Sequence, residues 1–443
     1  MKKTLFTLLL SLTPLFSFAG IQTAPKAPWF NTIPNLFTKE ALIEKRTLEM
    51  VTPTGLLLYK AYFPWTDKEK YLISHDIADL PAWQGYLMAS YAFKEAVTGK
   101  DFDPEISKLA DGLLKFYEVT GIPGLLGRSV MPDYTGPMLP WMVTKEQRPT
   151  AYWIQGPKGQ WWRNGVAKDH VNLAVFGCSI PLALERRGQI HLTDETRQKL
   201  ISFMLPLVQR IVYHGFQIID WNGQRTEYGS LRSAANGFNQ LLMLHMLATA
   251  APYDRGMYKV YRSKIKGWHR TIGWSLEALG QGVHKIIENR RGTYDKPSFS
   301  DMQALGLAYL SLYFQEHRRK YMKSIRRGME GVWKFMRYER NPMFAIPYVA
   351  TIRAQEVHRI FPIIEDLRDF PVDKYEANTS RRDTKYIQPL ANRPYNTNYW
   401  KSSPFRAIAH TPPPKTGNEQ VFAGMDYLLA YWTGRYFNLV PHE

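Results

Sequence analysis

The sequence contains a single cysteine among 443 residues, and this scarcity sets the first limits on the protein. One thiol, Cys178, cannot form a disulfide within the chain, so stability has to come from packing. It lies in the apolar run from residue 173 to 184, which favours a small buried residue over a nucleophile. The chain also lacks HExxH and any set of cysteines typical of zinc sites, so we expect no metal centre.

Other familiar motifs are missing as well. No GxGxxG or P-loop string is present, so the sequence predicts no nucleotide cofactor and, more generally, no cofactor at all. No GxSxG elbow supports a serine hydrolase. Sustained alternation of apolar and polar residues is absent, which argues against a protein built on a large sheet.

The first residues have the pattern of a targeting segment. Lys2 and Lys3 precede an apolar run over 5–16, and residues 17–19 read Ser-Phe-Ala, a small-x-small cleavage signal. The run is too short to span a bilayer, and no later run reaches that length. We therefore predict a periplasmic or secreted protein that starts near Gly20, with no transmembrane segment. No cysteine follows the run, so no lipid anchor is expected there.

Charge and aromatic content narrow the class of partner. The formal net charge is +18, which favours anionic partners such as acidic polysaccharide, cell-wall polymer, membrane surface or nucleic acid. The densest basic cluster, over 318–327, has helical spacing typical of a solvated face, so a nucleic-acid partner is not expected. Aromatic residues make up 14% of the chain, with 13 Trp and 26 Tyr. An exported, basic, aromatic-rich chain points to a glycan or cell-envelope polysaccharide.

Helical periodicity recurs along most of the chain. It predicts helices over 39–50, 82–97, 104–119, 166–187, 193–214, 253–284, 300–315, 318–338 and 421–436. Between them, 121–165 is a Gly- and Pro-rich stretch with four tryptophans, typical of a functional or lid-like loop. We predict an all-α fold of the (α/α)6 toroid type; an open α-solenoid is the alternative. The expected organisation is a signal peptide over 1–19, an extended or short-helix leader over 20–69 and one toroid domain over 70–443.

The stretch from Val212 to Leu247 is the most distinctive part of the sequence. We interpret it as two helices joined by a polar bend, 220–229, in which Asn222-Gly223 is a strong turn signal. The bend combines two aromatic rings with two acids and an arginine. Such a mixture suits a sugar site, which needs stacking surfaces and hydrogen-bonding groups together. A merely solvated hairpin tip is the alternative.

Several strings occur in an order that resembles a family of exported bacterial proteins related to the six-hairpin glycosidases. They are AWQGYLMASYAFKEAVTG, KFYEVTGIPGLLGRS, IIDWNGQRTEYG, FNQLLML, IIEDLRDFPVD and MDYLLAYWTGRYFNL. The resemblance spans roughly residues 70 to 440 and implies a continuous toroid with a carbohydrate ligand. The chain departs from the family pattern at Tyr228, where Trp is expected. It departs again at 166–170, where VAKDH replaces a DxxDQ-like string and leaves only Asp169 of a carboxylate pair.

Glycoside hydrolysis usually needs two carboxyl groups, so acids at the starts of helices and in the bend are the catalytic candidates. The predicted catalytic residues are Asp79, Asp169, Asp220, Glu227 and Asp301. For Asp79, Asp169 and Asp301 the alternative is helix capping or pairing with the helix dipole. Asp220 and Glu227 lie in the bend, where capping does not apply.

Aromatic, cationic and amide side chains near these acids are the predicted substrate-binding residues. They are Trp83, His170, Trp221, Arg225, Tyr228, Arg232 and Asn236. Elimination from a uronate is the competing reaction, for which Asn236, Arg232, Tyr228, His170 and His214 offer the required groups. The sequence therefore leaves three functions open: glycoside hydrolase, polysaccharide lyase, and a noncatalytic glycan-binding or envelope-assembly protein.

Overall fold

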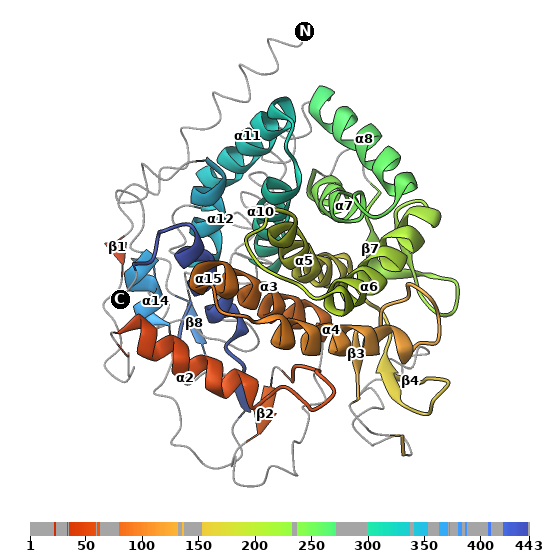
Figure 1. Ribbon diagram of the computed structural model, residues 1–443, viewed down its shortest axis with the longest axis horizontal. Helices are drawn as coiled ribbons and strands as arrows, with labels where there is room; N and C mark the ends of the chain where they lie inside the picture. Colours follow the sequence, from red (N-terminus) through yellow and green to blue (C-terminus); the bar gives the residue numbers. More distant parts are fainter. Residues whose placement is uncertain are drawn as a thin grey trace.

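The protein is described by a computed structural model. It covers residues 35–58, 60–62, 79–131, 135–136, 153–232, 237–271, 299–336, 341–352, 363–370 and 420–441, with short pieces at 22–23, 33, 372, 380–382, 386–387 and 406–408. Helices dominate the described part of the chain, which confirms the all-α prediction (Figure 1). None of its helices is long and apolar enough to cross a membrane. The predicted signal segment, 1–19, lies outside the described residues.

The helices fall into two kinds by the distribution of their buried residues. Six are buried around most of their circumference, as expected for helices enclosed by others. They are α3 (Leu80–Thr98), α5 (Lys168–Arg186), α7 (Gly237–Ala250), α10 (Phe299–Gln315), α12 (Pro342–Ile352) and α15 (Met425–Tyr436). The other helices leave more of their residues open to solvent. They are α2 (Leu36–Leu48), α4 (Asp103–Glu118), α6 (Asp194–Tyr213), α8 (Arg255–Arg270), α11 (Arg319–Met336) and α14 (Ile363–Asp369).

Contacts among the buried helices include a closed series. α3 packs against α5, α5 against α7, α7 against α10, α10 against α12, α12 against α15, and α15 against α3, and α5 also packs directly against α10. Each is covered by a more exposed helix: α4 on α3, α6 on α5, α8 on α7, α11 on α10 and α12, α14 on α12, and α2 on α15. Figure 1 shows α5, α3, α10 and α15 near the middle of the molecule, with α2, α8 and α11 toward its edge.

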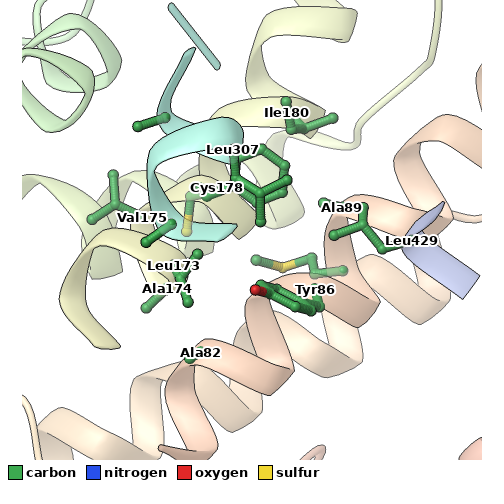
Figure 2. Close-up of a cluster of buried hydrophobic side chains, with 14 of the residues drawn as sticks. Ala82, Tyr86, Ala89, Leu173, Ala174, Val175, Cys178, Ile180, Leu307 and Leu429 are labelled. Carbon is green, nitrogen blue, oxygen red and sulfur yellow. The ribbon is translucent and has the colours of Figure 1, made fainter. Parts of the chain in front are cut away.

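The most extensive contact between two helices in the described chain joins α3 to α5. A Cβ atom added to Gly85 would lie 2.3 Å from the carbonyl oxygen of Leu173, and one added to Gly177 would lie 2.4 Å from the Cα of Gly85. The two backbones therefore touch, and any larger side chain at either glycine would force the helices apart. Tyr86 and Cys178 lie in the apolar cluster at this interface (Figure 2). Burial raises the pKa of the Cys178 thiol, as expected of a core residue.

Helix ends carry the signals that the sequence predicts. Thr193 caps α6, its Oγ1 accepting from the backbone N–H of Thr196 at 3.2 Å, with Asp194 in the first turn. Gly99 ends α3 with a φ of 66°, a left-handed conformation that costs glycine little. These capping residues fix where the long helices begin and end.

Two described helices, α12 and α14, lie between 338 and 421, where the sequence predicts no helix. α12 contains Pro347 in its interior and begins at Pro342. It is apolar on all sides, so it shows none of the amphipathic periodicity by which the other helices are recognised. α14 spans only seven residues, too short for a periodic pattern to emerge.

Short strands occupy several segments interpreted as loops. β6 (Gln217–Ile219) and β7 (Arg225–Ser230) form an antiparallel hairpin, so the predicted bend, 220–229, contains the turn and most of the second strand of a β-hairpin. β3 (Ser129–Val130), β5 (Trp161–Arg163) and β4 (Trp153–Gln155) form a small sheet in the Trp-rich stretch. The tryptophans of this sheet are buried, so its described part packs as core instead of lying open as a lid. Trp141 lies outside the described residues.

The segment that precedes α3 joins the same packed body. β2 (Lys60–Tyr62) pairs with β11 (Gln420–Phe422), and α2 packs on α15. The buried ammonium of Lys39 donates to the carbonyl oxygens of Leu367 and Arg368 at 2.9 and 2.6 Å. The remaining short strands are β1 (Gln22–Thr23) with β9 (Tyr386–Ile387) and β8 (Ser380–Arg382) with β10 (Arg406–Ile408).

Candidate functional site

Asp79 stands directly before α3 in an unusual backbone conformation. Its φ of 73° lies in the left-handed region, which costs a non-glycine residue energy but is tolerated best by Asn and Asp. Its carboxylate makes no capping bond to α3. Instead, Oδ1 lies 3.1 Å from a guanidinium nitrogen of Arg128 and 2.5 Å from Nε2 of His170. The capping alternative therefore fails for Asp79, whose side chain faces the start of α5.

His170 lies in the first turn of α5 and is buried. Its Nδ1 accepts the backbone N–H of Ala167 at 3.0 Å, so Nδ1 carries no proton. The neutral ring then holds its proton on Nε2 and donates it to Asp79. The local sequence fixes this tautomer, because the segment entering α5 supplies the donor to Nδ1.

Asp169 approaches the same imidazole from the neighbouring position of α5. Its Oδ2 lies 3.9 Å from Nε2 of His170, and its side chain is 22% exposed against 16% for Asp79. Two carboxylates thus lie within 3.9 Å of one ring nitrogen. Asp79, Asp169, His170 and Arg128 together are called the acid cluster below.

Arg128 connects the acid cluster to the hairpin. Its backbone N–H donates to the carbonyl of Arg163 at 2.8 Å, at the edge of the small sheet. A hydrogen bond to Glu227 raises the pKa of Tyr228 on β7, and the positive charge of Arg128 acts in the opposite direction.

A buried aromatic pair lies below the acid cluster on α3. Trp83 meets Tyr86 edge to face, with ring centroids 5.4 Å apart. Burial raises the pKa of Tyr86 well above its usual value, and the charges of Asp426 and Asp169 add to the rise. Trp83 is only 2% exposed, so its indole cannot offer an open stacking face. Both rings support the floor of the cluster.

Asp426 is a residue near the site that the sequence reasoning missed. It lies fully buried in the first turn of α15, and its charge reaches Tyr86. The signal that identifies it is an acid at the start of an otherwise apolar helix, within the string MDYLLAYW. A buried carboxylate in such a place needs a polar environment to remain charged.

Asp220 lies at the end of β6 and holds the hairpin to the segment before α5. Its Oδ2 accepts the N–H of Gly165 at 3.0 Å and its Oδ1 accepts that of Trp221 at 2.9 Å. Burial raises the pKa of Asp220, while these hydrogen bonds and the charge of Arg210 act in the opposite direction. Thr226 adds a second tether, its Oγ1 donating to the carbonyl of Val166 at 2.8 Å.

The rest of the hairpin is open to solvent. Trp221 is 50% and Tyr228 59% exposed, and Arg225 and Glu227 are exposed as well. The hairpin therefore offers two accessible ring faces beside two charged groups.

The remaining predicted residues lie elsewhere or outside the description. Arg232 donates from Nε to the carbonyl of Gly215 at 2.5 Å, at the base of the hairpin. His214 ends α6, and its pKa is lowered by burial and by Arg210. Asp301 lies in the first turns of α10, but its side chain is outside the description, as is all of Asn236. Among the described residues no group of His, Cys, Asp and Glu is arranged to hold a metal ion.

Comparison with known proteins adds no relative. No family model, no curated protein and no solved structure matches the chain.

Proposed function

We propose that the helices form an (α/α)6 toroid. The closed series of contacts from α3 through α5, α7, α10, α12 and α15 back to α3 supports this arrangement, as does the covering of each by a more exposed helix. In such a ring, loops at one end surround a common centre. The acid cluster at the starts of α3 and α5 and Asp426 at the start of α15 fit one end of that ring.

We propose that the protein is an exported carbohydrate-active enzyme that cleaves an anionic or cell-envelope glycan. The single observation that carries this proposal is the meeting of Asp79 and Asp169 at the imidazole of His170. Paired carboxyl groups are what acid–base cleavage of a glycosidic bond requires. The exposed rings of the nearby hairpin supply stacking faces for a sugar, and the charge of +18 favours an anionic chain.

Hydrolysis fits the geometry better than elimination. Asp79 accepts from both Arg128 and His170, which keeps it anionic and suits a base or nucleophile. Asp169 is less engaged and more open, as suits the group that exchanges a proton with the leaving oxygen. Elimination would need a cation to neutralise a uronate, and Arg128 is already paired with Asp79.

Product analysis separates these reactions. Purified protein is incubated with neutral and uronate-containing oligosaccharides, and the products are examined for new reducing ends and for unsaturated sugars. Reducing ends without unsaturation support hydrolysis, and unsaturated products support elimination. Binding without any product supports the alternative, a noncatalytic glycan-binding or envelope-assembly protein that has kept the hairpin surface.

Export is part of the proposal. The charged and apolar pattern of residues 2–16, with the cleavage signal over 17–19, supports cleavage near Gly20. Mass spectrometry of the protein recovered from the producing cell would detect a mature chain that starts near Gly20. A chain that retains Met1 would contradict the export.

A further inference from the structure

One face of the molecule carries a regular row of positive charge. The exposed residues Arg255, Lys259, Arg262, Lys266 and Arg270 recur along α8 at intervals of three and four, so they lie on one side of the helix. The row extends over about 22 Å at the rise of an α-helix. The opposite side of α8 is buried through Met257, Tyr261, Ile265 and Trp268.

A second basic helix lies beside the first. α11 contacts α8, and Figure 1 shows the two helices next to each other at the top of the molecule. Arg319, Lys320, Lys323 and Arg327 are exposed on α11. α8 contains no acidic residue and α11 only Glu330. The exposed cations of the two helices are called the basic face below.

Among the described residues, the exposed cations of α8 have no acidic partner, unlike Lys199 on α6. None of its five exposed cations forms an ion pair with any residue in the described part of the chain. On α6, by contrast, Lys199 lies 3.0 Å from Asp111 and 2.8 Å from Glu195. Like charges in a row repel one another, so an unpaired row weakens the fold slightly and is expected where an anion neutralises it.

We propose that the basic face binds a linear anionic polysaccharide. A single file of cations matches a polymer with charges repeating along its length, and release of counterions favours the association. A membrane is the weaker fit, because an interfacial helix inserts an apolar face and that of α8 is already buried in the protein. The charge arrangement by itself supports binding of a linear polyanion. The identification of that polyanion as a polysaccharide rests on the proposed function.

The basic face is linked to the hairpin through the base of β6. The ammonium of Lys264 on α8 lies 4.4 Å from the ring centroid of Phe216, and the N–H of Leu231 donates to the Phe216 carbonyl. Phe216 immediately precedes β6, the strand that leads to the hairpin tip. A chain held along α8 therefore lies beside the element that carries Trp221 and Tyr228.

The test is binding of polygalacturonate, a linear uronate polymer, to the full mature chain at several salt concentrations. The triple variant Lys259→Gln, Arg262→Gln and Lys266→Gln is compared with a control of equal charge change, Lys100→Gln, Lys108→Gln and Lys158→Gln, at exposed sites elsewhere. We expect the α8 variant to bind roughly tenfold more weakly, since each surface ion pair contributes a small factor. The slope of log Kd against log salt should fall by about 2, at roughly 0.7 per lost contact. The control should change little.

Three results would overturn the proposal: equal weakening by both triple variants, tighter binding to phosphatidylglycerol vesicles than to polygalacturonate, or tighter binding to single-stranded DNA. Dextran, a neutral polymer, should not bind.

The outcome is separable from the proposed enzyme activity. If polygalacturonate binds through α8 but no glycan is cleaved, the basic face stands and the enzymatic proposal fails. If the α8 variant cleaves glycan at the native rate and binds polygalacturonate as tightly as the native protein, the enzymatic proposal stands and the basic face fails.

Discussion

Asp79 and Asp220 are both acids that contact the chain near the start of α5, but their carboxylates have different kinds of partner. Asp79 accepts from two side chains, Arg128 and His170, whereas Asp220 accepts from the backbone N–H groups of Gly165 and Trp221. Side-chain donors can move or exchange protons when a substrate arrives. Backbone donors are fixed by the fold. From this comparison we propose that Asp79 takes part in the chemistry and that Asp220 positions the hairpin that carries the aromatic rings.

The largest expected effect comes from Asp79→Asn. Asn tolerates the left-handed conformation at this position, so the backbone should be retained. Removing the anionic oxygen should lower the rate of glycan cleavage by about 10² to 10⁴, the usual contribution of a general acid or base. Steady-state assays of Asp79→Asn and of Asp220→Asn, each compared with the native protein, measure the loss in the cleavage rate. A smaller loss for Asp79→Asn than for Asp220→Asn would reverse the assignment of roles.

His170→Gln should have the next largest effect, on stability and activity together. It removes the bond from Nε2 to Asp79 and the acceptor for the Ala167 N–H, both in a buried place. Losing these partners should lower the free energy of unfolding by about 2 kcal/mol. Urea denaturation measures this change. An unchanged midpoint would show that the imidazole does not organise the acid cluster.

Asp220→Asn should cost less, about 1 kcal/mol, because Asn can accept only one of the two backbone N–H groups. The pH dependence gives a sharper test. Burial raises the folded-state pKa of Asp220, so its protonated form is favoured in the native protein. The stabilisation from that proton is fully present below the unfolded pKa and is lost as pH rises through the folded pKa.

The advantage of the native protein over Asp220→Asn should therefore shrink as pH rises across the acid range. Thermal melts of both proteins at a series of pH values measure it. An advantage that grows with pH would mean that the folded-state pKa of Asp220 is lowered, and that the carboxylate is held as an anion in the same way as Asp79.

Trp221→Ala should have the smallest effect on stability, within about 0.5 kcal/mol, because the side chain is 50% exposed. Binding of an oligosaccharide should weaken about three- to tenfold through loss of a stacking face. Tyr213→Ala, which removes an aromatic ring that is 85% exposed at the end of α6, is the matched control. Equal weakening by both variants would argue that any exposed ring suffices and that the hairpin is not a site.

The sequence predicted the long helices well, and it placed the acids at their starts. Thr193 and Gly99 carry local capping chemistry that can be recognised without tertiary information. α12 escaped prediction because a helix that is apolar on every side has no periodic stripe. The sequence predicts a bend where the hairpin of β6 and β7 lies, because strands of three and six residues are too short to show sustained alternation. The local signal for the hairpin is the Asn222-Gly223 turn at its tip.

The candidate site was predicted in parts and not as a whole. The sequence identifies Asp79, Asp169 and His170 as separate candidates. Their side chains come together because Gly85 contacts Gly177, which brings α3 and α5 close to each other. Arg128 has no local signal, and the only signal for Asp426 is an acid at the start of an otherwise apolar helix. Distant packing, which spacing along the chain does not encode, decides which acids share an environment.

The most direct test of the account is chemical rescue of Asp79→Gly. Glycine fits the left-handed backbone at this position, and the missing carboxylate leaves room for an added anion such as formate. The account predicts that Asp79→Gly loses glycan cleavage and regains part of it as formate concentration rises, whereas Asp220→Gly shows no formate dependence. Cleavage by Asp79→Gly at the native rate without formate would contradict a catalytic role for Asp79, as would rescue of Asp220→Gly alone.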